Sequence, residues 1–128
     1  MATDRSDQHW LETYKSLITL SIEAFKFAAL ANGGAAVALL AYIGNVAAKC
    51  GNPPDMRRAM ASFLAGLCAL GFSMLCSYLT QLKLLNESNA TQKPKLSHRW
   101  LLWSGIVLFV TSLVMFGVGS WQAIVGFK

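Results

Sequence analysis

The stretch Phe27–Ala48, which reads FAALANGGAAVALLAYIGNVAA, contains no acidic or basic side chain. A helix needs roughly 20 apolar residues to cross a hydrocarbon core about 30 Å thick. This stretch therefore predicts a transmembrane helix. Two further runs, Ala59–Leu82 and Trp100–Phe127, are also free of charged side chains and long enough to cross a membrane. The sequence thus predicts an all-α integral membrane protein with three transmembrane helices.

The composition leaves no room for a separate soluble domain. Of the 128 residues, 55% are hydrophobic and 13% are charged, whereas a soluble domain carries roughly 25% charged residues. We therefore interpret residues 1–128 as a single membrane domain whose surroundings are the lipid bilayer. It divides into an amphipathic arm, residues 1–26, and three spans, residues 27–48, 59–82 and 100–127.

The net charge of +5 fits membrane topology better than nucleic-acid binding, because lysine and arginine are enriched on the cytoplasmic side of membrane proteins. One side of the predicted protein carries Arg5, Lys15, Lys26, Lys83, Lys93, Lys95 and Arg99. The other side carries Lys49, Arg57, Arg58 and Lys128. This asymmetry predicts a cytoplasmic N-terminus, an external C-terminus and no nucleic-acid partner. We expect the basic residues around the second connection to attract anionic lipid headgroups.

The arm has the pattern of an amphipathic helix. Between Ser6 and Lys26 there is no proline or glycine, and apolar residues recur every three or four positions. Nothing separates the arm from the first span, so we predict one continuous helix from about Ser6 to Lys49 that projects into the cytoplasm. The alternative is an arm that bends and lies flat on the membrane surface. The residues expected to dock a partner on a projecting arm are Trp10, Tyr14, Leu17, Ile18 and Phe25.

The connections between the spans are marked by residues that break helices. Cys50–Asp55 contains Gly51 and two prolines, which end the first helix. Asp55 is the expected cap of the second helix, which should run to about Glu87, and Ser97 is the expected cap of the third.

Small side chains follow a regular step in the first two spans. Alternating steps of three and four residues give Ala59, Ser62, Gly66, Ala69, Ser73, Cys76 and Thr80 in the second span. The same steps give Gly34, Ala38, Ala41, Asn45 and Ala48 in the first. In lipid, helices associate by close backbone approach over small residues, and this period is that of a left-handed helix pair. We therefore predict that these two seams face each other in a tight antiparallel hairpin.

The third span repeats small residues every seven positions, at Gly105, Ser112, Gly119 and Gly126. This stripe predicts a further packing interface, with the hairpin or with another copy of the chain. Polar residues within the spans, such as Asn32 and Gln122, are expected to form hydrogen bonds between helices. Cys68 and Cys76 are expected to be buried as small apolar side chains.

The sequence carries no pattern typical of catalysis or of metal binding. All six carboxylates lie outside the spans, so no buried pair is available for acid–base chemistry. His9 and His98 are far apart, and no cysteine stands at metal-ligand spacing from either. We therefore predict a protein that is not an enzyme and has no catalytic, cofactor-binding or metal-binding residues.

The segment Ala31–Asn45, ANGGAAVALLAYIGN, is preceded by the arm and followed further on by Ser77–Gln81, SYLTQ. In this layout the chain resembles small bacterial inner-membrane proteins that have no assigned activity. The resemblance implies a multi-pass protein of the bacterial inner membrane, whose C-terminus then lies in the periplasm. It transfers no functional residue.

Three functions are compatible with these features. The first is assembly, as a homo-oligomer or as a small accessory subunit of a membrane complex, with the arm docking a partner. The second is a pore-forming or membrane-permeabilising effector, of the phage-defence or holin-like kind. The third is an ordinary transporter or channel, which the absence of charged residues within the spans disfavours. We expect the first.

Overall fold

The computed structural model describes residues 2–51, 54–89 and 99–126, and within these ranges it contains three helices and no strand. Helix α1 comprises Ala2–Cys50, α2 comprises Arg57–Asn89 and α3 comprises Arg99–Gly126. Each of them is long and apolar enough to cross a membrane. The chain is therefore an all-α protein with three candidate membrane spans, as the sequence predicted.

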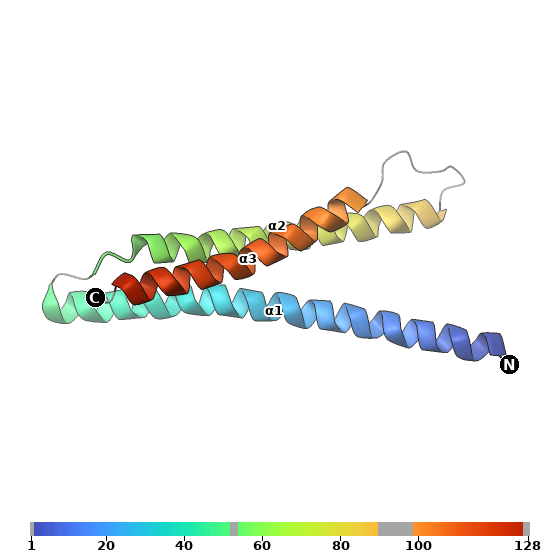
Figure 1. The fold of residues 1–128 in the computed structure, drawn as a ribbon, viewed down its shortest axis with the longest axis horizontal. Helices are drawn as coiled ribbons and strands as arrows, with labels where there is room; N and C mark the ends of the chain where they lie inside the picture. The colour runs from blue at the N-terminus through green and yellow to red at the C-terminus, as the bar shows by residue number, and fades with distance from the viewer. Residues whose placement is uncertain (1, 52–53, 90–98, 127–128) are drawn as a thin grey trace.

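The arm and the first span form one uninterrupted helix of 49 residues, which is about 74 Å long at a rise of about 1.5 Å per residue. This confirms the predicted continuity, and α1 does not turn between the arm and the span (Figure 1). The helix ends at Cys50 and is followed by Gly51, whose φ of 72° is left-handed and whose N–H donates to the carbonyl of Ala47 at 3.3 Å. This is the αL cap that glycine favours at a helix C-terminus.

The second helix begins as predicted. The Asp55 carboxylate accepts a hydrogen bond from the backbone N–H of Arg57 at 3.2 Å, which satisfies one of the free donors of the first turn. Helix α2 then continues to Asn89, two residues beyond the predicted end. The predicted cap of α3, Ser97, lies outside the described residues.

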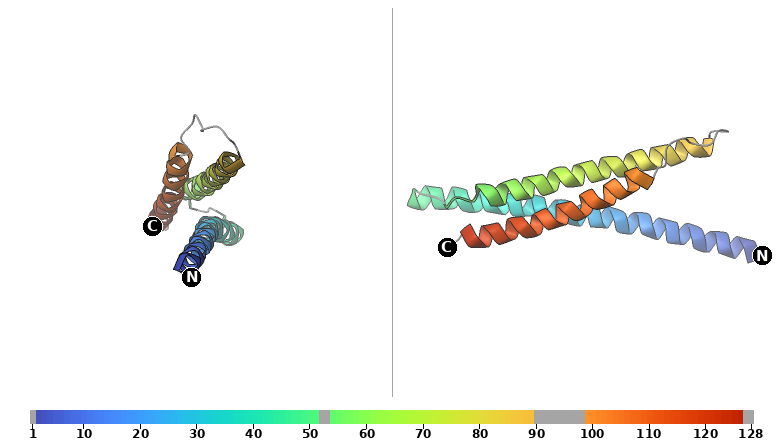
Figure 2. Two further views of the ribbon diagram at one scale, coloured as in Figure 1. Left: turned by 90° about the vertical axis from the view of Figure 1, so that its right-hand side faces the viewer. Right: turned by 45° about the horizontal axis from the view of Figure 1, so that its top comes forward.

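Helices α2 and α3 lie side by side and antiparallel, whereas α1 joins them over its C-terminal half only (Figure 1). The views in Figure 2 show that the N-terminal half of α1 diverges from the other two helices. The buried apolar cluster lies at the end where α1 connects to α2, and its members are Ala36, Leu39, Met56, Ala59 and Phe63. The two ends of the bundle therefore differ: one is packed and the other is open.

The surface of the bundle has the character expected in lipid. Within the most apolar 18-residue stretch of α3, only 11% is buried inside the chain. Most of the large apolar side chains of α3 therefore face outward. Trp100 and Trp121 are 81% and 69% exposed and lie about 31 Å apart along α3, close to the thickness of a hydrocarbon core of about 30 Å. Tryptophans at this spacing suit the two membrane–water interfaces.

Candidate functional site

The small-residue seam of α2 is a packing interface in the structure. Its seven positions, Ala59, Ser62, Gly66, Ala69, Ser73, Cys76 and Thr80, are all buried or half-buried. The seam contacts α3 along much of its length and contacts α1 at Gly66. The seam therefore packs within the chain, but its principal partner is α3 and not the first span that the sequence predicted.

The small-residue stripe of α3 is the other half of this interface. Gly105, Ser112 and Gly119 are buried. A Cβ added to Gly119 would lie 2.7 Å from the ring of Phe63 on α2, and a Cβ added to Gly105 would lie 3.6 Å from the Cβ of Cys76. The sequence left the partner of this stripe open, and the structure shows that Gly105 and Gly119 face α2 of the same chain.

Hydrogen bonds reinforce the contact between α2 and α3. The buried Ser73 hydroxyl donates to the Gly105 carbonyl at 2.6 Å, and the Ser62 hydroxyl donates to Oε1 of Gln122 at 3.1 Å. Hydrogen bonds of this kind contribute about 0.6 kcal/mol each within a membrane. The expectation that Gln122 bonds between helices is thus confirmed.

Asn32 joins α1 to the other two helices and is fully buried. Its Nδ2 donates to the carbonyl of Ser112 at 3.3 Å and to the hydroxyl of Ser112 at 3.2 Å. Its Oδ1 has no hydrogen-bond partner and faces Gly66, where an added Cβ would overlap it. The amide therefore fits only because residue 66 has no side chain.

The predicted seam of α1 is not part of the interface, and the hairpin prediction was wrong in this respect. Gly34, Ala38, Ala41, Asn45 and Ala48 are all exposed. The face that packs is the opposite one, because Gly34 lies about 200° around the helix from the buried Asn32. Small residues occur on both faces of α1, so their spacing could not decide which one turns inward. The buried face carries the larger Leu39 and the amide of Asn32, which both need partners.

The two cysteines of α2 behave differently from each other. Cys68 is exposed, contrary to the prediction, whereas Cys76 is half-buried against α3. The physical reason is their position: Cys76 belongs to the seam, and Cys68 lies between two seam positions on the outer side of the helix.

Most of the predicted docking residues of the arm stand free of the bundle. Trp10 and Tyr14 stack on each other with ring centroids 5.7 Å apart, and they remain exposed together with Leu17 and Ile18. Phe25 differs, since it packs edge-on against Phe109 of α3 at 5.3 Å. Phe25 therefore belongs to the bundle, and the free apolar face of the arm ends at about Ile22.

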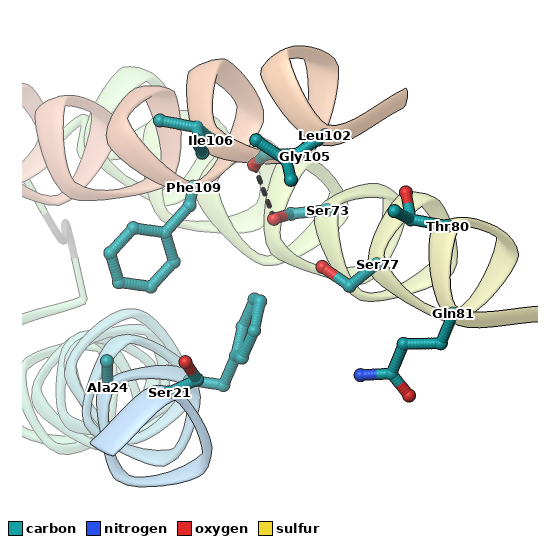
Figure 3. A pocket seen from close by; sticks show the side chains of 11 residues that line it. Ser21, Ala24, Ser73, Ser77, Thr80, Gln81, Leu102, Gly105, Ile106 and Phe109 are labelled. Atoms are coloured by element: carbon teal, nitrogen blue, oxygen red, sulfur yellow. Dashed lines mark hydrogen bonds between the residues drawn. The ribbon is translucent and has the colours of Figure 1, made fainter. Parts of the chain in front are cut away.

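A groove of about 340 Å³ lies where α1 diverges from α2 and α3 (Figure 3). Phe25 and Phe109 form its inner end, and Leu102 and Ile106 form an apolar wall. Its polar lining consists of Ser21, Ser73, Ser77, Thr80 and Gln81. Sequence reasoning missed this groove, because it depends on the angle between helices and not on any pattern within one of them.

The described residues contain no group of three or more histidine, cysteine, aspartate or glutamate side chains that could hold a metal ion. Comparisons of the chain with protein-family models, with curated proteins and with solved structures find no match.

Proposed function

We propose that this chain is a non-enzymatic protein of the bacterial inner membrane that acts by assembly. It forms a homo-oligomer or serves as an accessory subunit of a membrane complex, with its N-terminal arm in the cytoplasm and its C-terminus in the periplasm. The observation that carries this proposal is the outer face of α1, where five small or polar positions are left over after the helices of one chain have packed.

The outer face of α1 has the properties of a second packing surface. Small side chains at Gly34, Ala38 and Ala41 allow another helix to approach closely, which is how helices associate in lipid. Asn45 on the same face is exposed, and its amide would be costly to leave without partners in hydrocarbon. A neighbouring helix would cover the small residues and bond the amide.

The arm supports the same interpretation. Residues 2–26 extend about 38 Å beyond the first span. If α1 crosses the bilayer perpendicular to its plane, Trp10 and Tyr14 lie well outside the hydrocarbon core. Trp10 is 69% exposed and Leu17 is 58% exposed. Apolar side chains at helical spacing in an aqueous setting are typical anchors for a partner's groove or helix.

The main alternative is a pore-forming or membrane-permeabilising effector. Two fully buried polar side chains favour assembly over a pore through a single bundle, because each is hydrogen-bonded across a helix interface. Ser73 bonds Gly105 and Asn32 bonds Ser112, so these groups are engaged in packing and do not face a water-filled path. A dye for membrane potential would report depolarisation on regulated expression if the alternative holds.

Ala41→Leu should weaken the assembly without unfolding the chain, because Ala41 is exposed in the protomer and lies on the proposed contact. We expect the mass of the particle in mild detergent to fall toward that of one protomer, and crosslinks in native membranes to be lost. Ala65→Leu is the matched control, since Ala65 is exposed on α2 and outside the proposed contact. An unchanged particle mass and crosslinking pattern with Ala41→Leu, or a wild-type particle that contains one unaccompanied chain, would refute the proposal.

A further inference from the structure

Two polar side chains in the groove of Figure 3 make no hydrogen bond within the described part of the chain. The Ser77 hydroxyl and the Gln81 amide line this groove and make no hydrogen bond with any residue that the structure describes. The other hydroxyls of the lining are engaged: Ser21 donates to Leu17, and Thr80 donates to Cys76. The groove therefore offers two free hydrogen-bonding groups side by side on successive turns of α2.

Towards its inner end the groove is lined mainly by apolar side chains, and the polar Ser73 there is bonded to the Gly105 carbonyl. Gln81 is next to Leu82, the last residue of the second charge-free run, whereas Ser73 lies about 12 Å deeper along the helix than Gln81. At the deeper end the lining is formed by Phe25, Ile106 and Phe109. A polar mouth at the membrane boundary above an apolar interior matches the order of groups in a phospholipid, whose ester region lies above its acyl chains.

The charge around the mouth is positive. Three basic residues lie within three sequence positions of a residue that lines the groove, namely Lys26, Lys83 and Arg99. Among the residues whose side chains are described, Glu23 is the one acidic residue equally near in sequence. Glu23 is bonded to Lys26 at 2.8 Å. Because Lys26 is paired with Glu23, we assign the positive charge at the mouth to Lys83, and this charge is complementary to the phosphate of a lipid headgroup.

We propose that this groove binds one phospholipid from the leaflet on the arm side of the bundle. The upper part of an acyl chain lies against Phe25, Ile106 and Phe109. The ester carbonyls accept hydrogen bonds from Ser77 and Gln81, and the phosphate lies near Lys83. The volume of about 340 Å³ is at the lower end of the range for ligand sites, so the groove holds the ester region and part of one chain. This proposal does not depend on the assembly proposed above.

Native mass spectrometry of the full chain in mild detergent tests the site, with phosphatidylglycerol as the added lipid. We expect one phospholipid bound per protomer. Ala24→Trp, which fills the groove from α1, should weaken this binding at least about tenfold, whereas Ser104→Trp, on an exposed position of α3 outside the groove, should leave it unchanged. A double variant, Ser77→Ala with Gln81→Leu, adds no bulk and should weaken binding roughly fivefold to tenfold.

Three results would overturn the proposal. The first is a wild-type protein that binds no phospholipid under these conditions. The second is equal binding by the wild type and by both groove variants, which would place the lipid elsewhere. The third is an Ala24→Trp variant that binds as much lipid per protomer as the wild type but has a different number of copies per particle. That result would mean that another chain occupies the groove.

Discussion

Replacing Gly66 with leucine should detach α1 from the other two helices. A side chain at residue 66 would occupy the place of the Asn32 amide, which is fully buried and has no room to withdraw. The change therefore adds overpacking to the loss of the bonds between Asn32 and Ser112. We expect the free energy of unfolding to fall by about 3 kcal/mol, measured by titration with a denaturing detergent.

The matched control is Gly71→Leu. It makes the same chemical change on the same helix, but at a position where a Cβ would meet nothing within 4 Å. Its effect should be within about 0.5 kcal/mol. A crosslink between cysteines introduced by Gly33→Cys and Leu67→Cys should form in the Gly71→Leu background and fail in the Gly66→Leu background. Equal stability of the two leucine variants would show that Asn32 does not lock α1 at this point.

Gly119→Val should separate α3 from α2. The added Cβ would lie 2.7 Å from Cε1 and 2.9 Å from Cδ1 of Phe63. The Phe63 ring is buried and is held in turn by Phe116, with ring centroids 6.1 Å apart. The ring therefore has little freedom to move aside, and we expect a loss of about 1–3 kcal/mol in the free energy of unfolding.

Gly117→Val is the control for this second change, because a Cβ there meets nothing within 4 Å. Both variants replace a helical glycine by valine two residues apart, so the difference between them isolates the contact with Phe63. Adding Phe63→Leu to Gly119→Val should restore part of the loss, since the two residues interact directly. If Gly117→Val proves as destabilising as Gly119→Val, the stripe of α3 does not contribute to packing.

Much of the fold could be predicted from the sequence because its signals are local. The charge-free runs predicted three helices, and the structure confirms them with bounds within a few residues of the expected ones. Gly51 and Asp55 marked the first connection, because a left-handed backbone and a carboxylate cap are properties of single residues. The packing faces of α2 and α3 were also visible, since each of these helices carries a regular series of small side chains on the face that packs.

The face of α1 that packs could not be predicted in this way. Ala28 and Ala36 on the inner face are as small as Ala38 and Ala41 on the outer face, so spacing alone gave the wrong side. The decisive residue was Asn32, whose amide requires a hydrogen-bonding partner and a glycine opposite it. Recognising that requirement needs knowledge of which residues of α2 and α3 lie at the same depth.

The sequence by itself determined that the chain forms three helices long and apolar enough to cross a membrane, the approximate bounds of these helices, and which faces of α2 and α3 carry small side chains. These properties depend on the order of residues within one helix. Only the tertiary structure decided that α3 is the closest neighbour of α2, that Asn32 lies opposite Gly66, and that a groove opens beside Phe25 and Ser77. Those properties depend on the angle and depth at which separate helices meet, which are fixed by contacts between residues far apart in the chain.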